Sequence, residues 1–241
     1  MSIWSHLAQT ATLLLGVGGP LGTLVRDTLG RTGLSSGQPS RHKQVAFTIA
    51  AIALAAKMAS ADGHASEDEF LTFQRLFRVP EREQANAARF YRMAKQSTAG
   101  FEAYATQARK LLGAHQDVLE DLLEALLLIA VTDGVHDGEM DYLDRVAEIF
   151  GISGQAYARI RALYLPQAED DPFMILGLAP GTSLTEVRAA WRALVKEHHP
   201  DKHMEHGTPA EFIRVAEDRM AAINNAYQAI VRQYSKEEAS A

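Results

Sequence analysis

From residue 43 onward, apolar positions recur at the three- and four-residue spacing of helices, and no segment shows the alternation of a strand. The sequence therefore predicts an all-α protein. In the first two thirds of the chain we expect helices over residues 43–60, 66–77, 81–95, 99–112, 116–131, 139–150 and 154–165. Helices 43–60 and 116–131 are apolar over more than one stripe, which is typical of central helices.

The two central helices end alike, which indicates an internal repeat. Asp62-Gly63 follows the first helix and Asp133-Gly134 follows the second, each before a polar loop and a new acidic helix start. Glycine can adopt the left-handed conformation that closes a helix, and Ser66 and Asp137 can accept hydrogen bonds from the first free amides of the next helices. The repeat predicts a pair of helical hairpins around one core.

The C-terminal part of the chain predicts a second, antiparallel helical hairpin. Residues 184–198 have a helical apolar pattern that Pro200 must interrupt, because its ring forbids the helical conformation to the preceding residue. We expect a loop over residues 202–209 and a return helix over residues 210–233. A short helix closed by Gly177 is expected before the hairpin.

One face of this hairpin is cationic. Ser183 is expected to cap its first helix, along which Arg188, Arg192 and Lys196 recur every four residues. The tip that follows reads His199-Pro200-Asp201. On an acidic protein, such a basic ridge is suited to steering an acidic partner surface.

Four short motifs of this region resemble the J domain of DnaJ-type proteins. They are Leu176-Gly177-Leu178, Trp191-Arg192-Ala193-Leu194, His199-Pro200-Asp201-Lys202 and Ile223-Asn224-Asn225-Ala226-Tyr227. Four separate matches are far more specific than one tripeptide. The resemblance implies binding to a DnaK-class ATPase chaperone, with the tip triggering ATP hydrolysis. The partner-binding residues that it implies are His199, Pro200, Asp201, Arg188, Arg192, Lys196 and Lys202.

The doubled Asp-Gly pattern resembles the TerB-like helical domain of tellurite-resistance proteins. In that family the acidic residues of the two loops have been viewed as a metal or ligand site, which would correspond here to Asp62, Glu69, Asp133 and Glu139. The alternative is that the aspartates end helices while the glutamates favour helix N-termini through the dipole. A hard cation needs several converging carboxylates, and a sequence does not show convergence.

The predicted architecture is a TerB-like helical bundle followed by a J-domain helical hairpin. We expect a Gly-rich leader over residues 1–40, the TerB-like domain over 41–165, a linker over 166–171, the J domain over 172–235 and a tail over 236–241. This combination resembles bacterial J-domain co-chaperones, in which the first domain would serve for targeting or for binding a further protein. The alternative function is metal binding or a stress response through the acidic loops.

The charge, the cysteine content and the motifs of the chain argue against several classes of function. With a net charge of −6 the protein as a whole would repel nucleic acid, so no nucleic-acid partner is expected. The chain has no cysteine, which excludes disulfides and thiolate sites and fits a reducing compartment such as the cytoplasm. We find no nucleophile, base and orienting group and no phosphate-binding loop, so we expect neither an enzyme nor a bound cofactor.

Two features leave alternatives open. Residues 3–25 are broken by polar residues, glycines and a proline, which favours weak membrane association or a docked hairpin over a true span. Attachment to the inner face of the cell membrane therefore stays open.

A zinc cluster could be formed by four histidines near the tip, which are His198, His199, His203 and His206. Alternatively, they could be solvated side chains in a loop. Pro200 interrupts the spacing that a zinc site would use.

Overall fold

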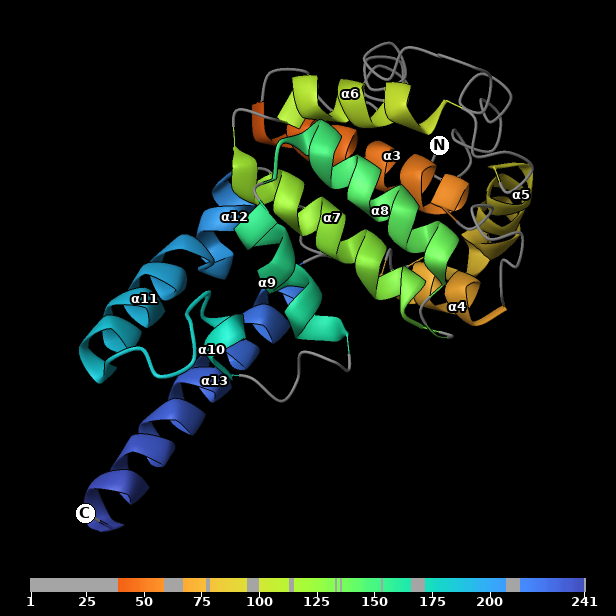
Figure 1. Ribbon diagram of the computed structural model, residues 1–241. Coiled ribbons are helices and arrows are strands. Elements are labelled where there is room, and N and C mark those ends of the chain that lie inside the picture. The colour runs from red at the N-terminus through yellow and green to blue at the C-terminus, as the bar shows by residue number, and fades with distance from the viewer. Residues whose placement is uncertain are drawn as a thin grey trace.

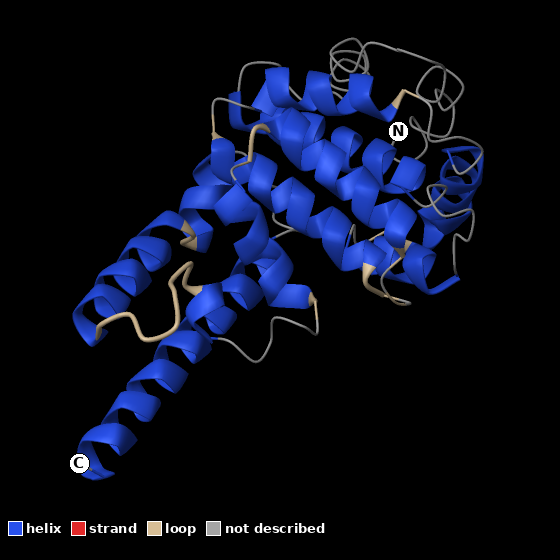
Figure 2. Ribbon diagram, in the orientation of Figure 1, coloured by secondary structure: helices blue, strands red, loops and turns tan. Residues whose placement is uncertain are grey.

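The computed structural model describes residues 39–58, 67–76, 79–94, 100–112, 115–132, 134, 136–152, 154–165, 172–206 and 213–240. Every regular element in these ranges is a helix, and they contain no strand (Figure 2). The predicted all-α class is confirmed. The buried apolar residues form two separate cores, one on each side of residues 166–171.

The first core is built around two helices, α3 (Pro39–Met58) and α7 (Gln116–Ala130). From Phe47 onward every described side chain of α3 is buried except Thr48. The surrounding elements are α4 (Glu67–Leu76), η1 (Glu81–Glu83), α5 (Gln84–Ala94), α6 (Phe101–Leu112), α8 (Asp137–Phe150) and α9 (Gly154–Tyr164). Figure 1 shows α6 lying along α3 and α8 lying along α7. The predicted helices over residues 43–60 and 116–131 are therefore central, as their apolar patterns indicate.

The internal repeat pairs Phe73 with Leu143 and Arg75 with Arg145 in the sequence, and the members of each pair are buried or exposed alike. Phe73 of α4 and Leu143 of α8 are fully buried, whereas Arg75 and Arg145 are exposed. Gly134 has a φ of 125°, a conformation that favours glycine.

One predicted cap of the repeat is wrong. Asp137 is the first residue of α8 rather than its cap, and the capping position is taken by His136, whose side chain makes no capping hydrogen bond. The Asp137 carboxylate instead lies in the first turn, where the helix dipole favours a negative charge. The other residues expected at these helix ends, Asp62, Gly63, Ser66 and Asp133, lie outside the described residues.

The second core belongs to a helical hairpin. Its helices are α10 (Pro172–Ile175), α11 (Leu184–Glu197), α12 (Pro200–His206) and α13 (Ile213–Ser240). As expected, Gly177 closes α10 with a φ of 69°, and the amide of Leu178 donates a hydrogen bond of 2.9 Å to the carbonyl of Phe173. Ser183 and Glu186 form a capping box at the start of α11.

Two of the motifs meet inside this hairpin. The Trp191 ring of α11 stacks on the Tyr227 ring of α13 with centroids 4.5 Å apart, and the indole N–H donates a 2.9 Å hydrogen bond to Asn224. The apolar ring of the indole is thereby packed, and its polar N–H group has a hydrogen-bond acceptor. The contacts fix the register of α11 against α13 and hence the position of the tip between them.

The structure corrects the expected loop after the tip. Residues Pro200–His206 form α12, where the sequence predicts a loop from residue 202. Proline is well placed at the first position of a helix because its missing amide has no helical partner there. The return helix also extends to Ser240 instead of residue 233, and its C-terminal end projects beyond the other helices (Figure 1).

Candidate functional site

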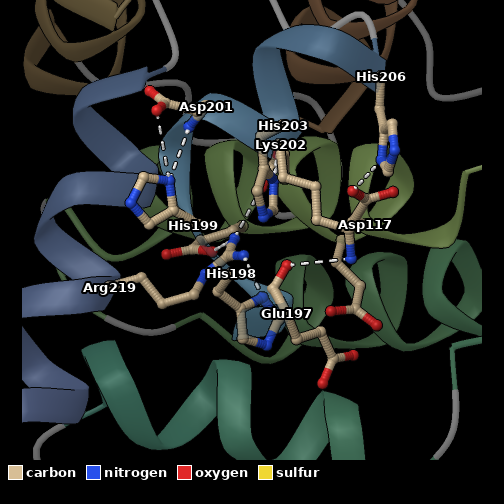
Figure 3. A network of polar contacts seen from close by, with 12 residues as sticks. Asp117, Glu197, His198, His199, Asp201, Lys202, His203, His206 and Arg219 are labelled. Atoms are coloured by element: carbon tan, nitrogen blue, oxygen red, sulfur yellow. Dashed lines mark hydrogen bonds and ion pairs between the residues drawn. The ribbon is translucent and has the colours of Figure 1, made fainter. Parts of the chain in front are cut away.

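The tip of the hairpin points two polar side chains toward solvent. The side chains of His199 and Asp201 are 54% and 76% exposed, and Pro200 between them begins α12. The backbone N–H of Asp201 donates to Nδ1 of His199 over 3.3 Å, so the imidazole caps the first turn of α12 (Figure 3). An imidazole and a carboxylate are therefore held side by side and open to a partner.

A ridge of cationic side chains leads along α11 to this tip. Arg188, Arg192 and Lys196 are all exposed and follow one another by one helical turn. Lys202 is half-buried, and its ammonium group donates to the carbonyl of Glu197 at the end of α11 over 3.5 Å. We use the term basic ridge for Arg188, Arg192 and Lys196.

The residues that flank the exposed tip point the opposite way. His198 and His203 are 1% and 0% exposed, and both face the first domain. The Nδ1 atom of His203 lies 2.6 Å from Oδ2 of Asp121 on α7. His198 and His203 thus attach the tip to the first domain, while the side chains of His199 and Asp201 take no part in this attachment.

A buried polar seam joins the two domains. The guanidinium group of Arg219, on α13, donates to Oδ1 of Asp121 over 3.0 Å and also to Glu124, both on α7. All three side chains are at most 2% exposed. Tyr164 at the end of α9 donates to the same Glu124. Because a buried charge is costly without a partner, these residues are positioned to hold α12 and α13 against α7.

Similarity to known proteins follows the same division of the chain. Residues 48–162 match the family described as Tellurite resistance protein TerB, and residues 171–238 match the DnaJ domain. The chain is a TerB domain followed by a DnaJ domain. The predicted resemblance to both families is confirmed, although the exact domain limits given above stay predictions.

Several curated relatives align with most of this chain and carry the name Co-chaperone protein DjlA. The relative from Vibrio cholerae serotype O1 is 27% identical over 82% of this chain and 81% of its own length. Those from Aliivibrio fischeri and Coxiella burnetii are 25% and 26% identical, over 85% and 83% of this chain and 84% and 81% of their own lengths. No solved structure matches the chain.

The membrane prediction concerns residues 3–25, which lie outside the described residues. Among the helices that the structure describes, none combines the length and the apolar character that a membrane crossing requires.

His198 has a distinct electrostatic environment in the seam. Its Nδ1 lies 3.1 Å from the guanidinium group of Arg219, and its Nε2 lies 3.3 Å from that of Arg159. Guanidinium groups only donate hydrogen bonds, so they favour a neutral imidazole. Burial, followed by the charge of Arg159, lowers the pKa of His198 from 6.5 to about 3. Burial opposes the charge of His203 as well and is the largest single effect. The hydrogen bond that Nδ1 of His203 donates to Asp121, together with the negative charges of Asp121 and Asp117, outweighs burial and raises the pKa of His203.

The seam is therefore expected to be most stable near pH 6.5. The lowered pKa of His198 provides stability that is present above its unfolded pKa of 6.5 and is lost as the pH falls below it. The raised pKa of His203 provides stability that is present below 6.5 and is lost as the pH rises through its folded value. Each histidine contributes at most about 1.4 kcal/mol per pH unit.

Urea denaturation at pH values below and above 6.5 tests the roles of His198 and His203 in this pH dependence. His198→Gln should flatten the acid side of the stability profile, and His203→Gln should flatten the alkaline side. Profiles of both variants that run parallel to the wild-type profile would contradict it. Both variants keep the charged groups around His198 and His203, which are Arg159, Arg219, Lys202, Asp117, Glu120 and Asp121.

The sequence does not predict this seam, although it contains one signal for it. Asp117, Glu120, Asp121 and Glu124 recur every three or four residues on a helix that is otherwise apolar. Acidic residues on a central helix require buried partners. Those partners lie 82 residues away for His203 and 98 for Arg219, so periodicity along one helix could not name them.

The candidate metal residues of the TerB domain are only partly described. Glu69 and Glu139 are each 1% exposed, at the starts of α4 and α8, while Asp62 and Asp133 lie outside the described residues. Their joint role as a metal site stays a prediction.

The four histidines near the tip do not form the zinc cluster that was one reading of the sequence. His198 contacts guanidinium groups, His199 caps α12, and His203 pairs with Asp121. Among the residues that the structure describes, His206 is the one of these four that belongs to a group of three potential metal ligands.

Proposed function

We propose that this chain is a co-chaperone that stimulates ATP hydrolysis by a DnaK-class chaperone. The observation that carries the proposal is the outward presentation of His199 and Asp201 beside the exposed basic ridge. The match to the DnaJ domain and the name of the curated relatives support it. In this proposal the catalytic groups belong to the chaperone, and the chain acts as a regulator without chemistry of its own.

The charge distribution supports an acidic partner surface. The chain carries a net charge of −6, yet Arg188, Arg192 and Lys196 present three cations on one face. Such a local patch attracts an acidic surface and orients the approach while the rest of the molecule is repelled. Asp201 can then form a charge-assisted hydrogen bond with a cationic group of the chaperone.

The TerB domain contributes a second role in this proposal. Through Arg219, Asp121 and Glu124 it holds the J domain in one orientation, so whatever the TerB domain binds is positioned relative to the tip. We propose that the TerB domain targets the J domain by binding a further protein. Lack of cysteine fits a reducing compartment, and the cytoplasm is the location that we propose.

Reversal of one ridge charge tests the electrostatic part of the proposal. Arg192→Glu should slow association with a DnaK-class chaperone about tenfold at low salt, because a repulsive charge replaces a steering one. The effect should shrink as salt screens the interaction. Association is measured by surface-based kinetics with the ATP-bound chaperone, at several salt concentrations.

Arg232→Glu is the matched control, because Arg232 is exposed on α13 and is not part of the basic ridge. This control makes the same change in net charge. Equal slowing by Arg192→Glu and Arg232→Glu would show that net charge alone acts, and it would refute the role of the ridge.

A further inference from the structure

Three metal-binding side chains meet at the edge of the seam. They are His115, just before α7, Asp117 in the first turn of α7, and His206, the last residue of α12. One potential ligand atom from each lies within 4.8 Å of the others, and all three residues are half-buried. Nδ1 of His206 lies 2.5 Å from Oδ2 of Asp117, and Figure 3 shows the two side chains directed at one another.

We propose that His115, Asp117 and His206 bind a divalent transition-metal cation, for which zinc is the best match. Two imidazoles and one carboxylate form a common zinc ligand set, and water can complete a tetrahedral site. Calcium and magnesium prefer oxygen ligands, so a set with two nitrogens disfavours them. This site shares no residue with the acidic loops of the TerB domain.

The spacing of the side chains suits a single ion. The imidazole rings of His115 and His206 lie 4.0 Å apart at the centroids and are inclined by 21°. Small side-chain rotations would bring one nitrogen of each ring and one oxygen of Asp117 to the distances of about 2.0–2.2 Å that zinc requires. A cation between them would also replace the direct contact of His206 with Asp117.

The backbone environment contains opposing electrostatic effects. The amino end of α7 carries the positive end of a helix dipole, which disfavours a cation, but the Asp117 carboxylate lies in that first turn and opposes it. His206 contributes from the carboxyl end of its own short helix. The negative charge of the Asp117 carboxylate therefore gives the ligand set an attraction for a cation.

The site would link the two domains. His115 and Asp117 belong to the TerB domain and His206 to the J domain, at the end of the helix that His199 caps. A bound cation would strengthen the attachment of α12 to α7 that His206 and Asp117 already form, next to the contact of His203 with Asp121. This inference does not depend on the proposed stimulation of a chaperone.

Calorimetric titration of the full chain with zinc chloride tests the site. After removal of metals with a chelator, we expect one zinc ion per chain. His206→Ala and His115→Ala should each weaken binding about 100-fold or more, because even loss of an outer partner of a metal ligand costs up to this factor.

Two control variants make the result specific. His136→Ala removes a histidine at the start of α8, outside the cluster, and should bind zinc like the wild type. Glu139→Gln should also leave zinc binding unchanged, which separates this site from the acidic loops. Asp117→Asn keeps the side-chain volume and, with circular dichroism of every variant, separates lost ligation from lost folding.

Cobalt substitution provides a spectroscopic readout. We expect cobalt to give the visible absorption of a tetrahedral site with nitrogen and oxygen ligands, and His206→Ala to remove it. Absence of saturable zinc binding, equal affinity of His206→Ala and the wild type, or loss of binding in Glu139→Gln alone would each overturn the proposal.

Discussion

Replacement of Arg219 by methionine is expected to destabilise the docking of the two domains by about 3–5 kcal/mol. The guanidinium group is 2% exposed and donates to both Asp121 and Glu124. Methionine keeps much of the side-chain length but leaves two buried carboxylates without their shared cation. Asp121 still contacts His203, and Glu124 still accepts the hydrogen bond from Tyr164. The cost arises because two buried carboxylates lose the cation that compensates their charge, more than from the contacts that are lost.

The size of this effect is measured by urea denaturation of the full chain. If the domains unfold together in the wild type, Arg219→Met should separate the transition into two, because the J domain loses its attachment before it unfolds. Arg232→Met is the control on the same helix, since Arg232 is exposed and its replacement should change stability by less than about 0.5 kcal/mol. Indistinguishable denaturation of the two variants would show that the seam does not hold the domains together.

His199→Gln is expected to abolish the stimulation of ATP hydrolysis while the fold stays intact. The side chain is 54% exposed, and glutamine can still offer an acceptor to the amide of Asp201, so the first turn of α12 should survive. What is lost is the imidazole itself, whose Nδ1 accepts from the amide of Asp201 while the opposite ring nitrogen can donate to a partner.

The dependence on co-chaperone concentration distinguishes this role from a simple loss of binding. Because the basic ridge is unchanged in His199→Gln, association should be similar, and the maximal rate should fall rather than the half-saturating concentration rise. Arg192→Glu should show the reverse pattern. A His199→Gln profile that reaches the wild-type maximum at higher concentration would assign His199 to binding alone.

The sequence was sufficient for most of the hairpin, because its signals are local. Gly177 closes α10, Ser183 caps α11, and Pro200 ends α11, each through contacts within a few residues. Helical periodicity also located the central helices, since α3 and α7 are buried on nearly all sides. Local chemistry of this kind depends little on the rest of the fold.

The helix α12 could not be foreseen in the same way. Its residues read as a polar loop, and the contacts that fix it are tertiary, between His203 and Asp121 and between His206 and Asp117. The exposed tip could be proposed from its motif, whereas the inward direction of His198 and His203 could not. The partners of the two inward-facing histidines are distant in the sequence. His203 faces Asp121, 82 residues earlier. His198 faces Arg159, 39 residues earlier, and Arg219, 21 residues later.

The account is tested most directly by single-turnover ATP hydrolysis of a DnaK-class chaperone, with the full chain added at saturating concentration. We expect the rate constant to rise above that of the chaperone alone with the wild-type chain, and to stay at the basal value with His199→Gln. A wild-type chain that leaves the rate unchanged, or a His199→Gln chain that raises it equally, would contradict the central claim that the exposed tip activates the chaperone.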